Sequence, residues 1–131
     1  MLKVPSLSCA FVFTLLLACT RPQDPSSADA GLFVSVRIPE SLMPLQRGQK
    51  YEVPLEETLG KRHLGELLGG GSQLGEKKPD GTHDVKFVSL DIELKDANGL
   101  PVLRQELKRL GAPEGTTLHY ELGGKRVSEP L

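Results

Sequence analysis

The stretch DVKFVSLDIELKD, residues 84–96, has the clearest structural pattern in the chain. Apolar and polar residues alternate along it, and this period of two predicts a β-strand with one packed face and one polar face. The apolar positions are Val88, Leu90, Ile92 and Leu94. The polar positions are Ser89, Asp91, Glu93 and Lys95. We therefore expect a sheet that is covered on one side only.

The next stretch, NGLPVLRQELKRLGAP at residues 98–113, predicts the helix that covers the apolar face. Its leucines recur at steps of three, four and three residues, which places them in one stripe along a helix. They are Leu100, Leu103, Leu107 and Leu110. Gly111 and Pro113 are typical of the residues that follow a helix. A last short strand is predicted at residues 115–122.

On the N-terminal side, alternation at residues 32–38 predicts another strand, which ends before Pro39. The segment 40–52 is predicted to be a loop because it contains Pro and Gly. A short helix is then predicted from Pro54, since proline is tolerated in a first helical turn and Leu55 and Leu59 are four residues apart. A weak strand is predicted at residues 65–74.

This order of elements is strand, helix, strand, strand, helix, strand. It predicts an α+β fold of the ferredoxin-like βαββαβ type, with a four-stranded antiparallel sheet and two helices on one face. The predicted single domain spans residues 32–122. Residues 123–131 are predicted to be a frayed C-terminal tail.

The N-terminus predicts export. Lys3 precedes an uncharged apolar run at residues 7–18, which is too short to span a bilayer and has the length of a signal-peptide core. The run ends in LLAC, residues 16–19, which resembles the lipobox of bacterial lipoproteins. The resemblance implies that a signal peptide at residues 1–18 is cleaved between Ala18 and Cys19, and that Cys19 receives the lipid. An ordinary signal peptide or an uncleaved anchor is the alternative.

Residues 19–31, rich in Pro, Ser, Asp and Ala, are then predicted to form a flexible tether. Thr20 stands where the lipoprotein family places Asp for retention in the inner membrane, so the resemblance favours the outer membrane in a Gram-negative cell. Cys9 would leave with the signal peptide, so the mature chain would have one cysteine and no internal disulfide.

A second resemblance concerns the domain. The run GGGSQLGE at residues 69–76, the acidic alternating strand and LGAPEGT at residues 110–116 resemble a group of small bacterial proteins with no established activity. These proteins share a GGG[ST]xLGE … LGAPxGT pattern, and the similarity covers residues 33–122. It supports the fold and implies no chemistry.

The glycine run also bears on catalysis. It does not complete a dinucleotide fingerprint or a nucleophile elbow, because Leu74 occupies the last glycine position of each. It does not complete a phosphate loop, because Glu76 replaces the lysine. We therefore expect the glycines to mark a bulge or a close backbone approach. A glycine-lined ligand surface is the alternative, and the candidate binding surface is Gly69, Gly70, Gly71, Ser72, Ser89, Asp91 and Glu93.

Neither composition nor histidine spacing favours nucleic-acid or metal binding. The net charge of −1 lacks the basic excess typical of nucleic-acid binding, and aromatic residues are only 5% of the chain. His63, His83 and His119 have no paired metal-ligand spacing, so we expect no metal and no cofactor.

The sequence therefore predicts a non-enzymatic protein of the cell envelope, held to the membrane by its N-terminal lipid and binding another protein. One alternative is an immunity-type protein that neutralises a toxin. Another is a small hydrolase in which Asp91 and Glu93, on one strand face, act as an acid–base pair.

Overall fold

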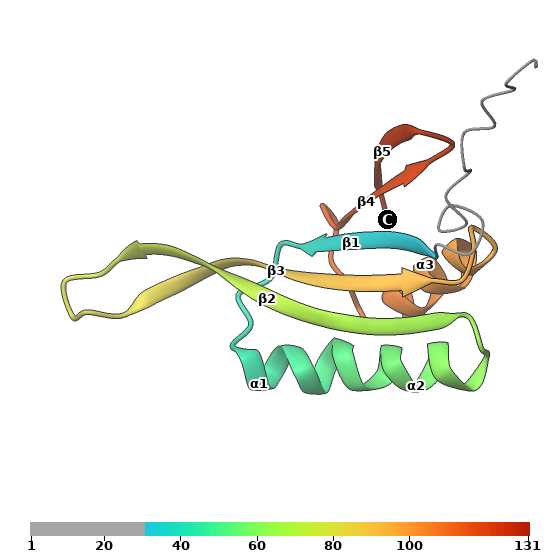
Figure 1. The fold of residues 1–131 in the computed structure, drawn as a ribbon. Coiled ribbons are helices and arrows are strands. Elements are labelled where there is room, and N and C mark those ends of the chain that lie inside the picture. The colour runs from blue at the N-terminus through green and yellow to red at the C-terminus, as the bar shows by residue number, and fades with distance from the viewer. Residues whose placement is uncertain (1–30) are drawn as a thin grey trace, which may run out of the picture.

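The computed structural model describes residues 31–131 and shows an α+β fold built on a five-stranded antiparallel sheet. The strands follow the order β2-β3-β1-β4-β5 across the sheet, and Figure 1 shows α1 and α2 running beside β2. The predicted signal peptide, with Ala18 and Cys19, and the predicted tether up to residue 30 lie outside the described residues. The strands are β1 (Leu32–Ile38), β2 (Gly65–Lys77), β3 (His83–Leu94), β4 (Thr117–Leu122) and β5 (Lys125–Pro130).

The core forms between one face of the central strands and the helices. β1 pairs with β3 so that Val34 lies opposite Ile92 and Val36 opposite Leu90, and all four side chains are fully buried. α3 (Gly99–Arg109) contributes Leu100, Leu103 and Leu107 to the same cluster. The alternation of residues 88–94 and the leucine stripe of residues 100–110 are thus confirmed, with Leu110 at the partly buried margin.

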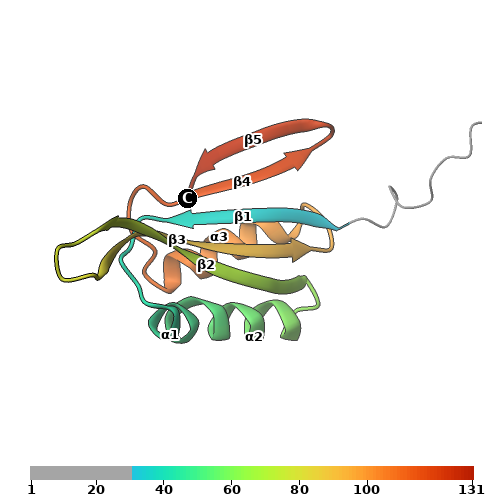
Figure 2. The same cartoon turned by 60° about the vertical axis from the view of Figure 1, so that its left-hand side comes forward.

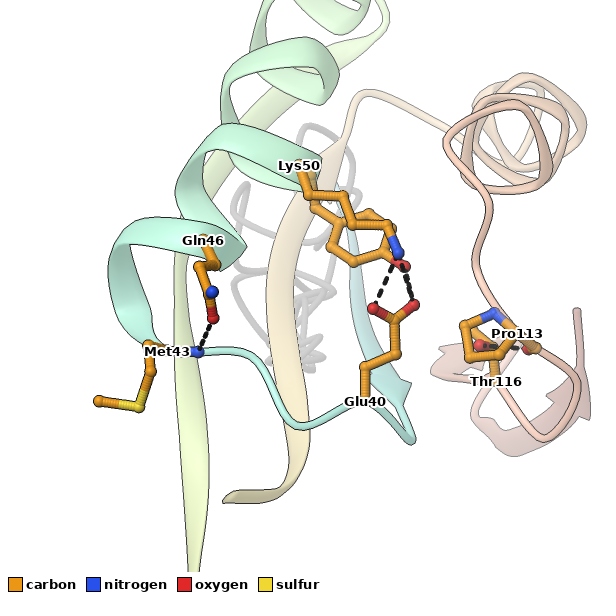
Figure 3. A network of polar contacts seen from close by, with 7 residues as sticks. Glu40, Met43, Gln46, Lys50, Pro113 and Thr116 are labelled. Carbon is orange, nitrogen blue, oxygen red and sulfur yellow. Dashed lines mark hydrogen bonds and ion pairs between the residues drawn. The ribbon is translucent and has the colours of Figure 1, made fainter. Parts of the chain in front are cut away.

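The segment predicted to be a loop is instead largely helical. α1 (Pro44–Arg47), the π-helical turn η2 (Gly48–Glu52) and α2 (Val53–Lys61) follow one another directly. Pro44 occupies the first helical turn, where a missing N–H costs no hydrogen bond, and the Gln46 side chain accepts from the Met43 N–H at 3.1 Å (Figure 3). Pro44 therefore marks the start of a helical segment, and Gly48 lies within that segment.

Helix formation over this segment has a packing reason. Tyr51, Leu55 and Leu59 recur at steps of four residues, lie on one side of the helix and are buried in the core. The Tyr51 hydroxyl donates to Oε1 of Glu40 at 2.5 Å, and Lys50 Nζ donates to both carboxylate oxygens of Glu40 at 2.9 and 2.8 Å. Figure 3 shows Lys50 above the Glu40 carboxylate. This network ties the end of β1 to the helix.

β2 and β3 form a hairpin that extends past the end of β1. Pairing of β3 with β1 ends at Val88, whereas its pairing with β2 continues to His83. We call residues 73–87 the hairpin arm; Figure 1 shows it projecting from the body of the domain. Its turn is closed by a hydrogen bond from the Lys78 N–H to the Thr82 carbonyl at 2.7 Å, and Gly81 supplies a positive φ of 86°.

The C-terminal segment predicted to be frayed forms a strand. β5 pairs with β4 along its whole length, from Leu122 opposite Lys125 to Thr117 opposite Pro130, and Figure 2 shows the two as a hairpin beside β1. Gly123 and Gly124 both have positive φ, 59° and 75°, as a tight hairpin turn requires. The prediction of four strands was therefore wrong by one. Residues 123–131 carry no apolar alternation, but the Gly-Gly pair was a hairpin signal.

Candidate functional site

The face of the sheet opposite the core is the candidate site, and we call it the open face. It consists of the side chains that alternate with the core residues of each strand, and they are exposed or half-buried. The members are Phe33, Ser35 and Arg37 of β1, Glu66, Gly69 and Gly71 of β2, Ser89, Asp91 and Glu93 of β3, His119 and Glu121 of β4, and Arg126 and Ser128 of β5.

Strand register arranges these residues in rows across the sheet. One row runs through five strands and carries mostly small side chains: Gly69, Asp91, Ser35, His119 and Ser128. The adjacent row, which we call the acceptor row, consists of Glu66, Glu93 and Phe33. In the first row, a glycine and two serines alternate with Asp91 and His119. The acceptor row places two carboxylates in line with a phenyl ring.

The predicted binding surface is divided between two faces of the sheet. Gly69, Gly71, Ser89, Asp91 and Glu93 lie on the open face, as their pairing with β3 or β1 shows. Gly70 and Ser72 face the helices instead, because successive residues of a strand point to opposite sides. The seven residues therefore do not form one continuous surface.

Gly70 and its neighbours confirm the structural interpretation of the glycines. A Cβ built on Gly70 would lie 2.6 Å from Oε1 of Glu52 and 2.9 Å from the carbonyl oxygen of Ser89. The helical segment therefore approaches β2 here more closely than a side chain would permit. A β-bulge also interrupts the register between Leu67 and Gly69. Both features were expected from glycine in a strand.

An ion pair lies directly over Gly70. Arg47 Nε contacts Oε1 of Glu52 at 2.5 Å, and Arg47 Nη1 donates to Ser72 Oγ at 2.8 Å. Ser72 Oγ donates in turn to the Leu42 carbonyl at 3.2 Å. The Arg47 side chain is only 11% exposed, and through it this cluster connects helix and strand. Sequence reasoning missed Arg47 and Glu52 because their segment was predicted to be a loop.

The charges of the open face are not balanced within the described residues. Glu66 lies directly opposite Glu93 on the neighbouring strand, an arrangement in which like charges repel. The six ion pairs among residues 31–131 involve neither of these carboxylates, nor Asp91, nor Glu121. Arg37 is engaged elsewhere, with its guanidinium carbon 3.8 Å from the centre of the Phe87 ring. The open face therefore has a net negative character.

The open face is also hollowed. Pairing of β1 with β4 stops at Val34 opposite Tyr120, and a concavity of about 630 Å³ lies between the start of β1 and the β4–β5 hairpin. Its lining includes Phe33, Ser35, His119, Glu121, Arg126 and Ser128. Phe33, at the edge of this concavity, is 50% exposed. An exposed aromatic ring beside such a hollow is typical of an interaction surface.

Asp91 and Glu93 share the open face, as the hydrolase hypothesis requires. Neither residue lines the 630 Å³ concavity or a smaller one of about 270 Å³ between α2 and α3. Within residues 31–131 the pair therefore lies outside both of these concavities, whereas acid–base chemistry usually takes place in a cleft that restricts water.

The smaller concavity contains a buried carboxylate with a structural explanation. Glu106 of α3 is 8% exposed and accepts from Arg109 Nε at 2.9 Å and from Thr58 Oγ1 of α2 at 3.2 Å. The hydrogen bond from Arg109 lowers the pKa of Glu106 below its ordinary value, while burial opposes that shift. Glu106 therefore fastens α3 to α2 as a carboxylate.

Residues 31–131 contain no group of three or more His, Cys, Asp or Glu side chains that could hold a metal ion. Within the same residues, no helix has the length and apolar character needed to cross a membrane.

Comparison with protein-family models, with curated proteins and with solved structures found no match to this chain. The functional interpretation therefore depends on the geometry of the open face and on the N-terminal sequence.

Proposed function

We propose that the protein is a non-enzymatic, lipid-anchored binding module of the cell envelope, which presents the open face of its sheet to a protein partner. The observation that carries the proposal is the acceptor row. An exposed Phe33 lies in line with two carboxylates that no cation neutralises within residues 31–131. A surface of this kind gains stability when a partner covers it.

We also propose that β1–β4 with the two helical segments form a ferredoxin-like βαββαβ unit, to which β5 is added at the β4 edge. The strand order β2-β3-β1-β4 and the placement of helical segments between β1 and β2 and between β3 and β4 support this. The resemblance of residues 33–122 to the GGG[ST]xLGE … LGAPxGT group is consistent with such a unit.

The proposed anchor is a lipid on Cys19. The lipobox-like LLAC at residues 16–19 supports it, and Thr20 supports an outer-membrane position in a Gram-negative cell. Two or three acyl chains would hold the protein firmly, since each buried methylene contributes about 0.8 kcal/mol and one chain alone is marginal.

The anchor is tested by labelling cells with a palmitate analogue. We expect the wild-type chain to be labelled and to sediment with membranes, and Cys19→Ala to remain unlabelled and uncleaved or soluble. Cys9→Ala is the matched control, because it removes the other cysteine and should leave labelling unchanged. Equal labelling of the wild type and Cys19→Ala would refute the anchor.

The docking face is tested by site-specific photo-crosslinking in cells that express the full chain. A crosslinking residue at Ser35 of the open face should yield a discrete adduct with one protein, and the same residue at Glu56, on the exposed side of α2, should not. Absence of an adduct from Ser35, or the same adducts from both positions, would contradict the proposal.

A further inference from the structure

Phe33 of the open face and Phe87 of the hairpin arm project from the same side of the sheet, and among residues 31–131 only Phe87 of these two has a cation over its ring. Arg37 of β1 lies over Phe87 of β3 with 3.8 Å between the guanidinium carbon and the ring centre. Phe33 is on the same strand face as Arg37, two positions along the alternation, and no lysine or arginine among residues 31–131 lies over its ring. Within residues 31–131, Phe87 therefore has a cation over its ring and Phe33 does not.

A cation over Phe33 would lie closer to carboxylates than Arg37 does over Phe87. Phe33 lies directly opposite Glu93, which lies directly opposite Glu66, so a cation above the ring would also be next to the repelling pair of carboxylates. A cation placed there gains from the ring face and relieves the repulsion between Glu66 and Glu93. By contrast, Arg37 lies opposite Ser89.

The space around Phe33 fits a side chain delivered by an extended backbone. The 630 Å³ concavity begins at Phe33, and the neighbouring row alternates Gly69, Ser35 and Ser128 with Asp91 and His119. The glycine and the two serines allow a backbone to lie close to the sheet at these three positions. Nucleic acid and anionic lipid are disfavoured, because their phosphates would face the carboxylates.

We propose that the acceptor row of Glu66, Glu93 and Phe33 binds an arginine or lysine side chain from an extended segment of the protein partner. This rests on the proposed function and names the chemistry of the partner. The cationic group stacks on the Phe33 ring and donates to Glu93, while the apolar stem of the side chain covers the remaining exposed part of the ring. Arg126, at the far side of the concavity, stays near its cross-strand neighbour Glu121.

Calorimetric titration of the full chain in detergent with an oligoarginine peptide tests the proposal directly. We expect Glu93→Lys to weaken binding by about tenfold or more, since a like charge replaces an attractive one. The matched control is Glu56→Lys, which makes the same change of charge on the exposed side of α2 and should alter binding by no more than about twofold through general charge alone.

Phe33 variants separate ring stacking from simple charge attraction. Phe33→Leu keeps an apolar side chain without a π face and should weaken binding about threefold, whereas Phe33→Trp should retain or improve it. Circular dichroism checks that both variants fold, which is expected at a half-exposed position. Equal effects of Glu93→Lys and Glu56→Lys, together with no effect of Phe33→Leu, would overturn the proposal.

The crosslinking experiment distinguishes this proposal from the docking function. An adduct from Ser35 that persists in Glu93→Lys and Phe33→Leu would leave the open face as a docking surface and refute the acceptor row. Loss of the adduct in these two variants, with retention in Glu56→Lys, would support both. No adduct from Ser35 in the wild type would refute the docking function itself.

Discussion

Gly70 is the residue at which the helical segment comes closest to the sheet. We expect Gly70→Ala to destabilise the domain by about 1–3 kcal/mol, because the new methyl group would overlap the Ser89 carbonyl and displace the Arg47–Glu52 pair. Gly60→Ala is the matched control: nothing lies within 4 Å of a Cβ there, and alanine favours helix, so stability should rise by up to about 1 kcal/mol. Urea denaturation measures both changes. Equal effects would contradict the close approach at Gly70.

Tyr51 is a buried group whose ionisation affects stability at high pH. Burial first, and the hydrogen bond to Glu40 next, raise the pKa of Tyr51 well above its ordinary value of 10.0. The folded state therefore holds the phenolic proton more tightly than the unfolded state, so this contribution is present below pH 10.0 and is lost as the pH rises above it. Tyr51→Phe should cost about 1 kcal/mol at neutral pH and show a smaller alkaline loss than the wild type. Urea denaturation at neutral pH and above pH 10.0 measures the free energy of unfolding of both proteins. An equal loss of stability at alkaline pH in Tyr51→Phe and the wild type would refute the expectation.

Single residues also show how far sequence reasoning reaches. Val88, Leu90, Ile92 and Leu94 were identified as core because alternation along a strand is a local pattern. The Arg47–Glu52 pair over Gly70 was not identified, because it depends on which segment crosses β2, and residues 47–52 were predicted to be a loop.

At the scale of elements, β5 is held by specific contacts in place of an apolar face. Tyr120 of β4 donates to Oε1 of Glu129 at 2.5 Å, Arg104 of α3 pairs with the same carboxylate, and Arg104 Nη1 donates to the Pro130 carbonyl at 3.1 Å. These contacts explain why a segment without hydrophobic alternation is ordered as a strand, and why periodicity alone predicted a frayed tail.

Truncation after Leu122 tests the role of β5. We expect removal of residues 123–131 to destabilise the domain more than Glu129→Ala, which should cost about 1 kcal/mol, since the truncation also exposes the hydrogen-bonding edge of β4. Thermal unfolding and size-exclusion chromatography measure the loss of stability and any association through that edge. A truncated chain as stable as the wild type would show that β5 is dispensable.

The contact between α2 and α3 predicts a response to acid. The pKa of Glu106 is lowered chiefly by its hydrogen bond from Arg109, so its contribution to stability is present above the ordinary value of 4.5 and is lost as the pH falls below it. Glu106→Gln should therefore lose less stability than the wild type between neutral and acid pH. Chemical denaturation across that pH range measures the free energy of unfolding. The same dependence on pH in the wild type and Glu106→Gln would contradict the role given to the Glu106 carboxylate.

The helical segment of residues 44–61 shows why element boundaries are hard to predict. Pro44 and Gly48 suggested a loop by local rules, yet Tyr51, Leu55 and Leu59 supply a buried face that the sheet requires. Packing of these residues against the sheet outweighed the local preference of Pro and Gly for a loop. That packing depends on strands distant in the sequence, so local rules do not predict it.

For the whole molecule, the division between core face and open face predicts that stability and binding respond differently to the same change. Glu93→Lys should leave stability unchanged or raise it by about 0.2–1 kcal/mol, because it replaces the repulsion across from Glu66 with attraction. The same substitution is expected to weaken binding of a cationic partner. Thermal unfolding checks the first expectation, and a clear drop in stability would show that Glu93 has a structural role.

Sequence reasoning reached the fold class because amphipathic periodicity is local, and it placed Ser89, Asp91 and Glu93 on the polar face for the same reason. It could not place Phe33 in line with Glu93 and Glu66, since that row depends on the register between three strands. The concavity beside Phe33 depends on where β4 parts from β1, which is a property of the assembled sheet.

The alternation along β1 and β3 has an evolutionary consequence. Adjacent positions such as Val34 and Ser35 belong to opposite sides of the same strand, so mutation at one disturbs the interior and mutation at the other changes the exposed surface. Substitutions at every second position of these strands can thus accumulate during evolution with little penalty to folding.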